Sequence, residues 1–159
     1  MTRIETIVIV HKDSKILLGL KNPNKKFGGK WNGFGGGLEE NQTLEECAIT
    51  ETIDETGITP KNLTRVGQIL FKFEINEQDH EVHIYRATDY GGILDTSKDF
   101  IEYKEFEKKD LENIYEKMMP ADKYWLPLFF DKKLFKGDVL FDKEMKNPKV
   151  NIYEVEKLD

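Results

Sequence analysis

The chain of 159 residues contains a single cysteine, Cys47, so it has no intrachain disulfide framework. It also lacks any apolar run close to the roughly 20 residues that a transmembrane helix requires. Its first residues show no basic segment followed by an apolar stretch and a cleavage site, which argues against a secretory signal. We therefore expect a cytoplasmic protein that has no membrane partner.

Clustered positive charge is missing as well. The chain has 24 Lys and Arg residues against 30 Asp and Glu residues, for a formal net charge of −6. Proteins that bind duplex nucleic acid usually carry a basic face, so this balance argues against such a partner. A small phosphorylated ligand remains compatible, because a local basic pocket or a metal ion offsets a modest global charge.

Short apolar runs separated by polar turns predict a protein with many strands. Hydrophobic residues make up 38% of the chain, which allows one packed domain over residues 1–159. Strands are predicted at 6–10, 15–20, 63–75, 80–88, 103–106, 137–141 and 151–155, with a turn at 76–79 and the last two strands at an edge. Helices are predicted at 43–56 and from 120 to about 134. This pattern predicts an α+β fold in which a mixed sheet lies between helices.

The first predicted helix has clear signals at both ends. Thr43 and Glu46 have the spacing of a capping box, in which each side chain accepts a hydrogen bond from a free backbone N–H. Gly57 suits the left-handed residue that ends a helix. The predicted apolar stripe consists of Leu44, Cys47 and Ala48, with Ile49 and Ile53 beside it.

Three acidic residues of this helix, Glu51, Asp54 and Glu55, have the spacing i, i+3 and i+4 and therefore share one face. Like charges at this spacing destabilise a helix by roughly 0.2–0.5 kcal/mol, and no cationic side chain lies between them. A divalent cation such as Mg²⁺ would compensate, because it prefers oxygen ligands. The alternative is a solvated acidic helix face without a ligand.

A glycine-rich segment at 33–37 precedes the helix. A tight turn there would bring backbone N–H groups and the helix N-terminus near an anion such as a phosphate. Glycine-rich turns are common, so this signal alone is weak. The glycines, the helix and the three carboxylates at fixed offsets are far more specific together.

In this combination the chain resembles the Nudix hydrolases over roughly residues 3–141. The family's box, a Gly, five residues, a Glu, seven residues and Arg-Glu-apolar-x-Glu-Glu-x-Gly-apolar, is in register with residues 36–58. The segments 17–19, 30–36, 66–69 and 124–128 also resemble the animal-type oxidised-purine nucleoside triphosphatases related to MutT.

The box departs from the family pattern at three positions. Gln42 stands where the family has its first Glu, and Thr50 stands where it has Arg. The family's Glu and Arg are expected to pair and brace the loop against the helix. The joint loss of both leaves no unpaired buried charge, so the fold is expected to survive while catalysis is weakened. Asp54 replaces a Glu with a shorter acid.

The resemblance implies a metal site at the helix. Glu51, Asp54 and Glu55 would be the catalytic carboxylates, and together with Gly35 they would hold Mg²⁺, or alternatively Mn²⁺, against the phosphates. The family usually adds a carboxylate from a later loop. Glu102 is assigned to that role, and Asp99 stays open as the alternative.

The resemblance also implies a purine site, carried over from Thr6, Lys21, Asn32, Gly35, Gly36, Phe71, Phe73, Met119 and Asp122. Two positions depart from the animal enzymes, since Met119 stands in place of Trp and Ala121 in place of Asp. Phe71 and Phe73 have ordinary strand packing as an alternative, and Trp31 and Trp125 are expected in the core. An ionised Asp122 would accept hydrogen bonds from the guanine edge, so 8-oxo-dGTP is expected to be preferred over 2-hydroxy-dATP.

The implied activity is Mg²⁺-dependent cleavage of an oxidised purine nucleoside triphosphate to the monophosphate and pyrophosphate. One alternative is a Nudix enzyme for another substrate, such as a dinucleoside polyphosphate or a nucleotide sugar. Another is a nucleotide-binding module with weakened catalysis, suggested by Gln42 and Thr50. A monomer and a homodimer are both compatible with the sequence.

Overall fold

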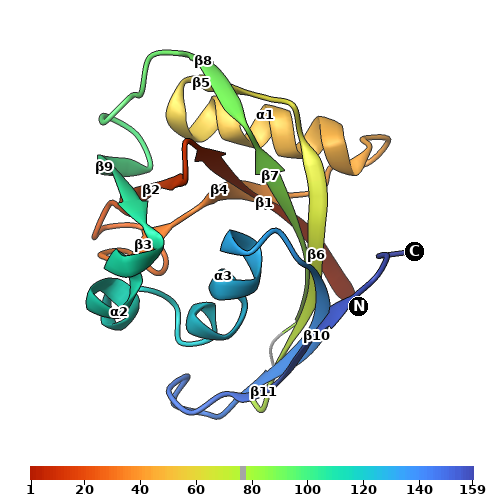
Figure 1. Cartoon of the computed structure of the whole chain (residues 1–159). Coiled ribbons are helices and arrows are strands. Elements are labelled where there is room, and N and C mark those ends of the chain that lie inside the picture. Colours follow the sequence, from red (N-terminus) through yellow and green to blue (C-terminus); the bar gives the residue numbers. More distant parts are fainter. Residues whose placement is uncertain (76–77) are drawn as a thin grey trace.

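A mixed β-sheet forms the centre of the molecule (Figure 1). The computed structural model describes residues 1–75 and 78–159. Within these residues the main sheet has nine strands, namely β1 (Thr2–Lys12), β2 (Lys15–Lys21), β3 (Trp31–Asn32), β4 (Phe34–Gly37), β6 (Thr64–Phe73), β7 (Asp79–Ala87), β9 (Phe100–Glu107), β10 (Leu134–Phe141) and β11 (Lys149–Val155). A separate two-stranded sheet pairs β5 (Ile58–Lys61) with β8 (Asp89–Gly92).

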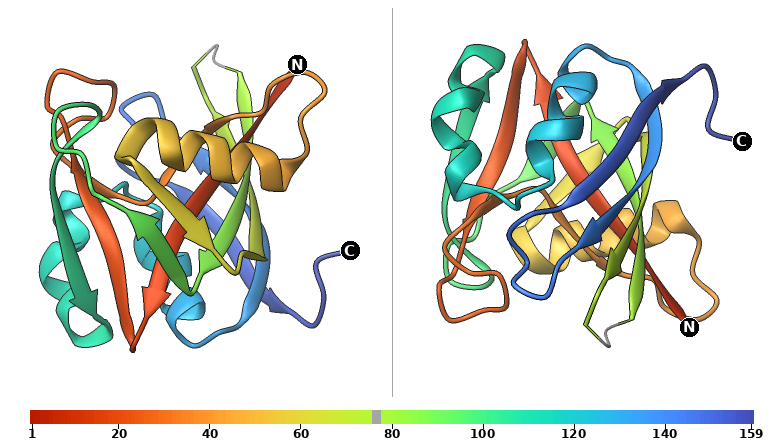
Figure 2. Two further views of the ribbon diagram at one scale, coloured as in Figure 1. Left: turned by 90° about the horizontal axis from the view of Figure 1, so that it is seen from above. Right: turned by 90° about the horizontal axis from the view of Figure 1, so that it is seen from below.

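Helices cover both faces of the main sheet (Figure 2). On one face lie α1 (Leu44–Thr56) and the β5–β8 pair, and on the other lie α2 (Leu111–Ile114) and α3 (Asp122–Phe130). Successive side chains of β1 point to opposite faces of the sheet. Val8 and Val10 belong to the core under α1, whereas Ile9 belongs to the core that contains α3. The predicted fold, a mixed sheet between helices, is confirmed.

Strand β1 pairs with three other strands. It pairs in parallel with β7 over residues 2–10, and antiparallel with β4 over residues 5–8 and with β2 over residues 10–12. The sheet therefore divides into two branches at β1. The glycine-rich strand β4 is the branch that lies against α1.

The caps of α1 agree with the sequence. The Thr43 hydroxyl accepts a hydrogen bond from the Glu46 N–H at 3.1 Å, the Glu46 carboxylate accepts one from the Thr43 N–H at 3.0 Å, and Gly57 is left-handed with φ of 81°. The predicted apolar stripe is partly wrong, because Ile53 is 39% exposed. The buried face continues instead through Thr52, Glu55 and Thr56.

Several predicted boundaries need correction. Helix α3 ends at Phe130 rather than about residue 134, since Lys132 takes a positive φ of 59° and leads directly into β10. Of the last two strands, which were both predicted at an edge, only β11 is an edge strand, because β10 lies between β6 and β11. The short strands β3, β4, β5 and β8 and helix α2 were not predicted. Residues 76 and 77 of the predicted turn lie outside the described residues, and Asp79 belongs to β7.

Helix α1, with 13 residues, is the longest of the described helices. None of them combines the length and the apolar character needed to cross a bilayer.

Candidate active site

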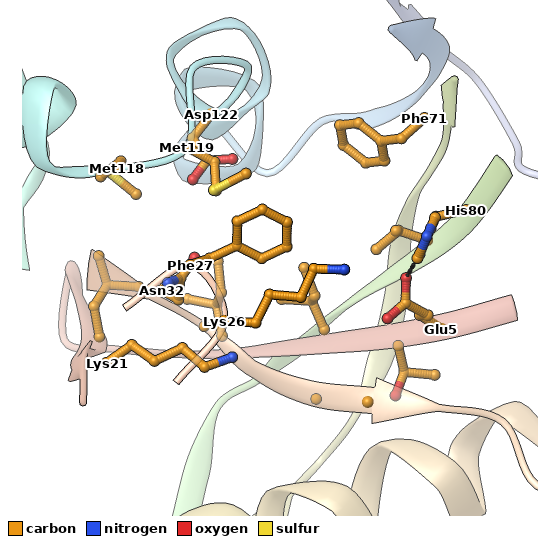
Figure 3. A pocket seen from close by; sticks show the side chains of 18 of the residues that line it. Glu5, Lys21, Lys26, Phe27, Asn32, Phe71, His80, Met118, Met119 and Asp122 are labelled. Atoms are coloured by element: carbon orange, nitrogen blue, oxygen red, sulfur yellow. Dashed lines mark hydrogen bonds and ion pairs between the residues drawn. The ribbon is translucent and has the colours of Figure 1, made fainter. Parts of the chain in front are cut away.

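A cavity of about 220 Å³ opens between β1, β6, β7 and the start of α3 (Figure 3). Its walls are largely apolar, with polar groups at separate points. Asp122 and Met119 lie on the α3 side, Lys21 reaches in from the end of β2, and Glu5 and His80 lie on the opposite wall. This combination of an apolar cavity with a few polar groups is typical of small-molecule sites.

All nine residues predicted for the purine site line this cavity. Thr6 does so without offering its side chain, because its hydroxyl lies 3.4 Å from the Cys47 thiol, below β1 on the α1 side. Cys47 itself is fully buried, as predicted for a core residue. Thr6 therefore lies at the cavity, while its hydroxyl is paired with the Cys47 thiol.

The predicted phosphate turn at 33–37 is instead strand β4, and this prediction was wrong. Residues 34–37 pair with residues 5–8 of β1, so their conformation is extended. Glycine is required here because helix α1 and β1 approach closely. A Cβ at Gly36 would lie 2.5 Å from Oε2 of Glu51, and a Cβ at Gly35 would lie 2.6 Å from the carbonyl carbon of Thr6.

Glu55 links α1 to the cavity. It is 9% exposed, and its Oε1 accepts a hydrogen bond from the Gly35 N–H at 2.6 Å. Burial raises its pKa to about 8, while the Gly35 N–H and the charge of Lys21 act in the opposite direction. Asp99 adds to the rise, so Glu55 faces another acid as well as a cation.

The other helix carboxylates lie near Glu55 in a strongly acidic region. Burial, and then the charge of Asp54, raise the pKa of Glu51, with Asp99 contributing in the same direction. Asp54 is exposed. Of the two candidates for the additional carboxylate, Asp99 is the one whose charge acts on both Glu51 and Glu55. Glu102 is exposed on β9, opposite Leu20, and nothing in its surroundings supports the assignment made from the sequence.

These carboxylates have the donor chemistry that suits a divalent cation. Within the described part of the chain, no three acidic, His or Cys side chains converge into a closed metal cage. Mg²⁺ does not require such a cage, since it commonly binds through one or two carboxylates together with substrate phosphates and water. Burial is the main cause of the raised pKa values of Glu51 and Glu55, and nearby acids add to it, so a bound cation would stabilise the ionised form of both.

Asp122 is the second buried carboxyl of the cavity. It is the first residue of α3 and is 8% exposed, and its Oδ1 accepts a hydrogen bond from Nε1 of Trp125 at 3.2 Å. Burial raises its pKa to about 7, against smaller opposing effects of Trp125, the Met119 backbone and Lys30. Asp122 therefore populates both protonation states near neutral pH, whereas the sequence interpretation assumed an ionised carboxylate.

Aromatic side chains form the apolar walls. Phe71 and Phe73 stack on Phe141 with ring centroids 6.1 and 5.6 Å apart, so they serve both strand packing and the cavity lining. Trp31 and Trp125 belong to the core, as predicted, and Trp125 also supports Asp122 through its indole N–H.

Sequence reasoning missed several lining residues, namely Glu5, Lys26, Phe27, His80, Met118, Phe141 and Met145. His80 was predicted only as the first residue of the strand at 80–88, yet its Nδ1 is hydrogen-bonded to Oε1 of Glu5 (Figure 3). The parallel register of β1 and β7 brings these two residues together, and no local sequence signal announces it.

The predicted brace positions make other contacts. Oε1 of Gln42 accepts the Glu39 N–H at 3.0 Å, and Thr50 is exposed. Gln42 therefore supports the turn that leads into α1, which is a local role that does not require a partner at position 50.

The chain is similar to several known proteins. The chain matches the NUDIX domain over residues 1–129. It is 34% identical over 141 residues to the oxidized purine nucleoside triphosphate hydrolase of Mus musculus, covering 88% of this chain and 87% of the mouse protein. The Danio rerio protein of the same name is 36% identical over 138 residues, covering 86% and 85%. An ADP-ribose pyrophosphatase of Methanocaldococcus jannaschii is 35% identical over 107 residues, covering 67% of this chain and 60% of that protein.

The fold also has solved counterparts. The crystal structure of a MutT protein from Bacillus halodurans superposes with a TM-score of 0.79 at 19% identity, covering 98% of this chain and 99% of that one. This likeness concerns the fold, whereas the family match and the vertebrate relatives extend over most of the sequence. The chain therefore belongs to the Nudix family and is a Nudix hydrolase.

Proposed function

We propose that the protein hydrolyses oxidised purine nucleoside triphosphates such as 8-oxo-dGTP to the monophosphate and pyrophosphate, with Mg²⁺ as the cofactor and Mn²⁺ as a substitute. The observation that carries this proposal is one cavity lined by two buried carboxyls, Asp122 at the start of α3 and Glu55 of the acidic helix. The names of the mouse and zebrafish relatives point to the same substrate class. Such an activity would remove damaged precursors before DNA synthesis.

The base would lie between the aromatic wall and the start of α3. Phe71 and Phe73 offer ring surfaces, and Met119 offers a flexible apolar side chain where the animal enzymes have Trp. Asp122 and Asn32 supply the polar atoms that face a purine edge. Asp122 accepts hydrogen bonds from a guanine edge when ionised and donates one to adenine N1 when protonated.

The phosphates would leave the cavity along β4 towards α1. Lys21 and the backbone of Gly35 and Gly36 line that side together with Glu55. Glu51, Asp54 and Glu55, with Asp99 as the additional carboxylate, are the residues that would hold the metal. A bound Mg²⁺ would neutralise charge on the phosphates and activate a water molecule for hydrolysis. Gly35 fixes one oxygen of Glu55, which leaves the other oxygen for the ion.

A hydrolysis panel tests this proposal. It compares 8-oxo-dGTP, dGTP, 2-hydroxy-dATP, dATP and ADP-ribose, with Mg²⁺ or Mn²⁺, by pyrophosphate release and by identification of the nucleotide product. The expected result is the highest kcat/KM for an oxidised purine triphosphate, with pyrophosphate as the second product. Absence of hydrolysis with either metal would contradict the proposal and favour the nucleotide-binding module.

The same panel addresses a second candidate, a nucleoside diphosphate-linked substrate. The similarity to the archaeal ADP-ribose pyrophosphatase favours it, as do Met119 and Ala121 in place of the residues of the animal enzymes. A higher kcat/KM for ADP-ribose than for every triphosphate would establish this candidate in place of the first.

A further inference from the structure

The space beside Gly37, at the end of β4, is filled by an arginine from another strand. A Cβ at Gly37 would lie 2.8 Å from Cζ of Arg3 and 3.3 Å from its Nε, and the three atoms nearest to that position all belong to this guanidinium. Gly37 has no positive φ, so its backbone does not require glycine. The missing side chain at position 37 is therefore what admits the guanidinium of Arg3.

Glu5 fixes the direction of this guanidinium. Its Oε2 lies 3.4 Å from Nε of Arg3, while its Oε1 is hydrogen-bonded to Nδ1 of His80. Glu5 and His80 both line the cavity (Figure 3), so the contact places Arg3 next to a lining residue. Because Nε makes the contact with Glu5, the Nη side of the guanidinium is turned over Gly37.

Arg3 also lies close to the carboxylate helix. Its charge lowers the pKa of Glu51, against the larger effect of burial, and Glu51 contacts the neighbouring Gly36. The charge of Lys21 likewise lowers the pKa of Glu55, against the larger effect of burial, and Glu55 accepts a hydrogen bond from the Gly35 N–H. A strand rises about 3.3 Å per residue, so Gly37 lies roughly 7 Å beyond Gly35. Two cations thus flank β4, with Lys21 within the cavity and Arg3 further out.

On the basis of the function proposed above, we infer that Arg3 forms a subsite for the terminal phosphates of the nucleoside triphosphate, the two that leave as pyrophosphate. A phosphate chain that passes Gly35 and Gly36 reaches Gly37 next, where the guanidinium lies. Guanidinium groups bind phosphate oxygens with two parallel hydrogen bonds, which an ammonium group does not reproduce.

Binding of the two reaction products tests the inference without any hydrolysis. Inorganic pyrophosphate and 8-oxo-dGMP are titrated separately, in buffer with Mg²⁺, into the parent protein and into Arg3→Gln, Arg3→Lys and Lys12→Gln. Lys12 is the matched control, because it lies at the other end of β1, pairs with a single carboxylate and has the same 49% side-chain exposure as Arg3. Thermal unfolding of each variant confirms that it is folded.

We expect Arg3→Gln to weaken pyrophosphate binding about tenfold, as for the loss of a hydrogen bond to a charged group. Arg3→Lys should give a smaller loss, and 8-oxo-dGMP binding should stay within about twofold. Lys12→Gln should change neither affinity. Unchanged pyrophosphate binding in Arg3→Gln, an equal loss for both ligands, or no pyrophosphate binding by the parent would overturn the subsite.

Gly37→Ala provides an independent variant that keeps Arg3. The new methyl group displaces the guanidinium, so part of the pyrophosphate affinity should be lost, and the change should add nothing in the Arg3→Gln background. Additive losses would show that the two residues act separately and would also overturn the subsite. Failure of the proposed substrate is distinguishable, because it would appear as no 8-oxo-dGMP binding and no triphosphate hydrolysis in the parent protein.

Discussion

Two buried carboxyls, Glu55 on α1 and Asp122 at the start of α3, line the same cavity in different surroundings. Burial raises the pKa of Glu55 to about 8 and that of Asp122 to about 7. Glu55 has Asp99 and the helix acids near it, together with Lys21 and the Gly35 N–H. Asp122 has the indole N–H of Trp125 and otherwise mainly apolar neighbours.

The different surroundings of Glu55 and Asp122 suit the two carboxyls to different ligands. A carboxyl that lies among other acids binds a cation favourably, because the cation neutralises the cluster and stabilises the ionised form of the carboxyl. A carboxyl that lies mainly among apolar groups favours a ligand that can hydrogen-bond to it. Its protonation state decides whether it accepts a hydrogen bond from the ligand or donates one. Under the proposed function, Glu55 would therefore serve the metal site and Asp122 the base-reading site.

The largest expected effect comes from Glu55→Gln. The amide keeps an acceptor for the Gly35 N–H but loses the charge that a metal needs, so turnover should fall at least about a hundredfold for every substrate. Initial rates with saturating Mg²⁺ measure this loss. Turnover within a few-fold of the parent would remove Glu55 from the metal site.

The same variant should be more stable than the parent without metal. Below pH 4.5 the carboxyl is neutral in both the folded and the unfolded chain. As the pH rises towards 8 the unfolded chain ionises first, so the folded parent loses stability, by about 3 kcal/mol at pH 7. Glu55→Gln removes this loss, and urea unfolding at pH 5 and pH 8 should show a benefit that grows with pH. A benefit independent of pH would contradict the assigned cause.

Asp122→Ala should affect selectivity more than metal-dependent chemistry. The parent is expected to prefer 8-oxo-dGTP over 2-hydroxy-dATP, and the ratio of their kcat/KM values should fall by about 5- to 150-fold in the variant. Asp122→Asn, which keeps the volume but always carries a donor, serves as the control and should shift preference towards the adenine-type substrate. An equal or reversed preference in the parent would remove Asp122 as the base reader.

The ratio of the two kcat/KM values should also depend on pH. With a pKa of about 7, Asp122 is mainly protonated at pH 6 and mainly ionised at pH 8. The preference for 8-oxo-dGTP should therefore rise by up to about a hundredfold between these values, because the ratio of ionised to protonated Asp122 changes by that factor. Titration of Glu55 affects both substrates alike and cancels in the ratio. A ratio that stays flat with pH in the parent would mean that Asp122 does not titrate in this range.

The smallest effect is expected from rebuilding the brace of the family pattern. Gln42→Glu with Thr50→Arg should be tolerated, with a coupling of about 0.2–1 kcal/mol, because Thr50 is exposed. Thr50→Arg alone should do worse, since it adds a cation without its partner. A double-mutant cycle on thermal stability measures the coupling, and the substrate ratio should not change. A zero coupling would mean that the two positions do not touch.

Much of α1 could be predicted because its signals are local. The capping box, the left-handed Gly57 and the i, i+3, i+4 spacing of the acids depend on residues within one or two helical turns. The same holds for the β1–β2 pair around its polar turn. The glycine segment was misread because glycine suits a tight turn and a closely packed strand equally, and only the approach of β1 and α1 distinguishes the two.

Local sequence patterns were sufficient to predict the layered fold, the caps of α1 and the acidic helix face, and the family resemblance predicted the residues that line one cavity. The atoms that those residues offer to the cavity depend on tertiary contacts. The Thr6 hydroxyl turns to Cys47, Asp99 rather than Glu102 acts on the helix acids, and Arg3 enters the space left by Gly37. These outcomes depend on strand register and on burial, which join residues far apart in the chain and set the pKa of Asp122.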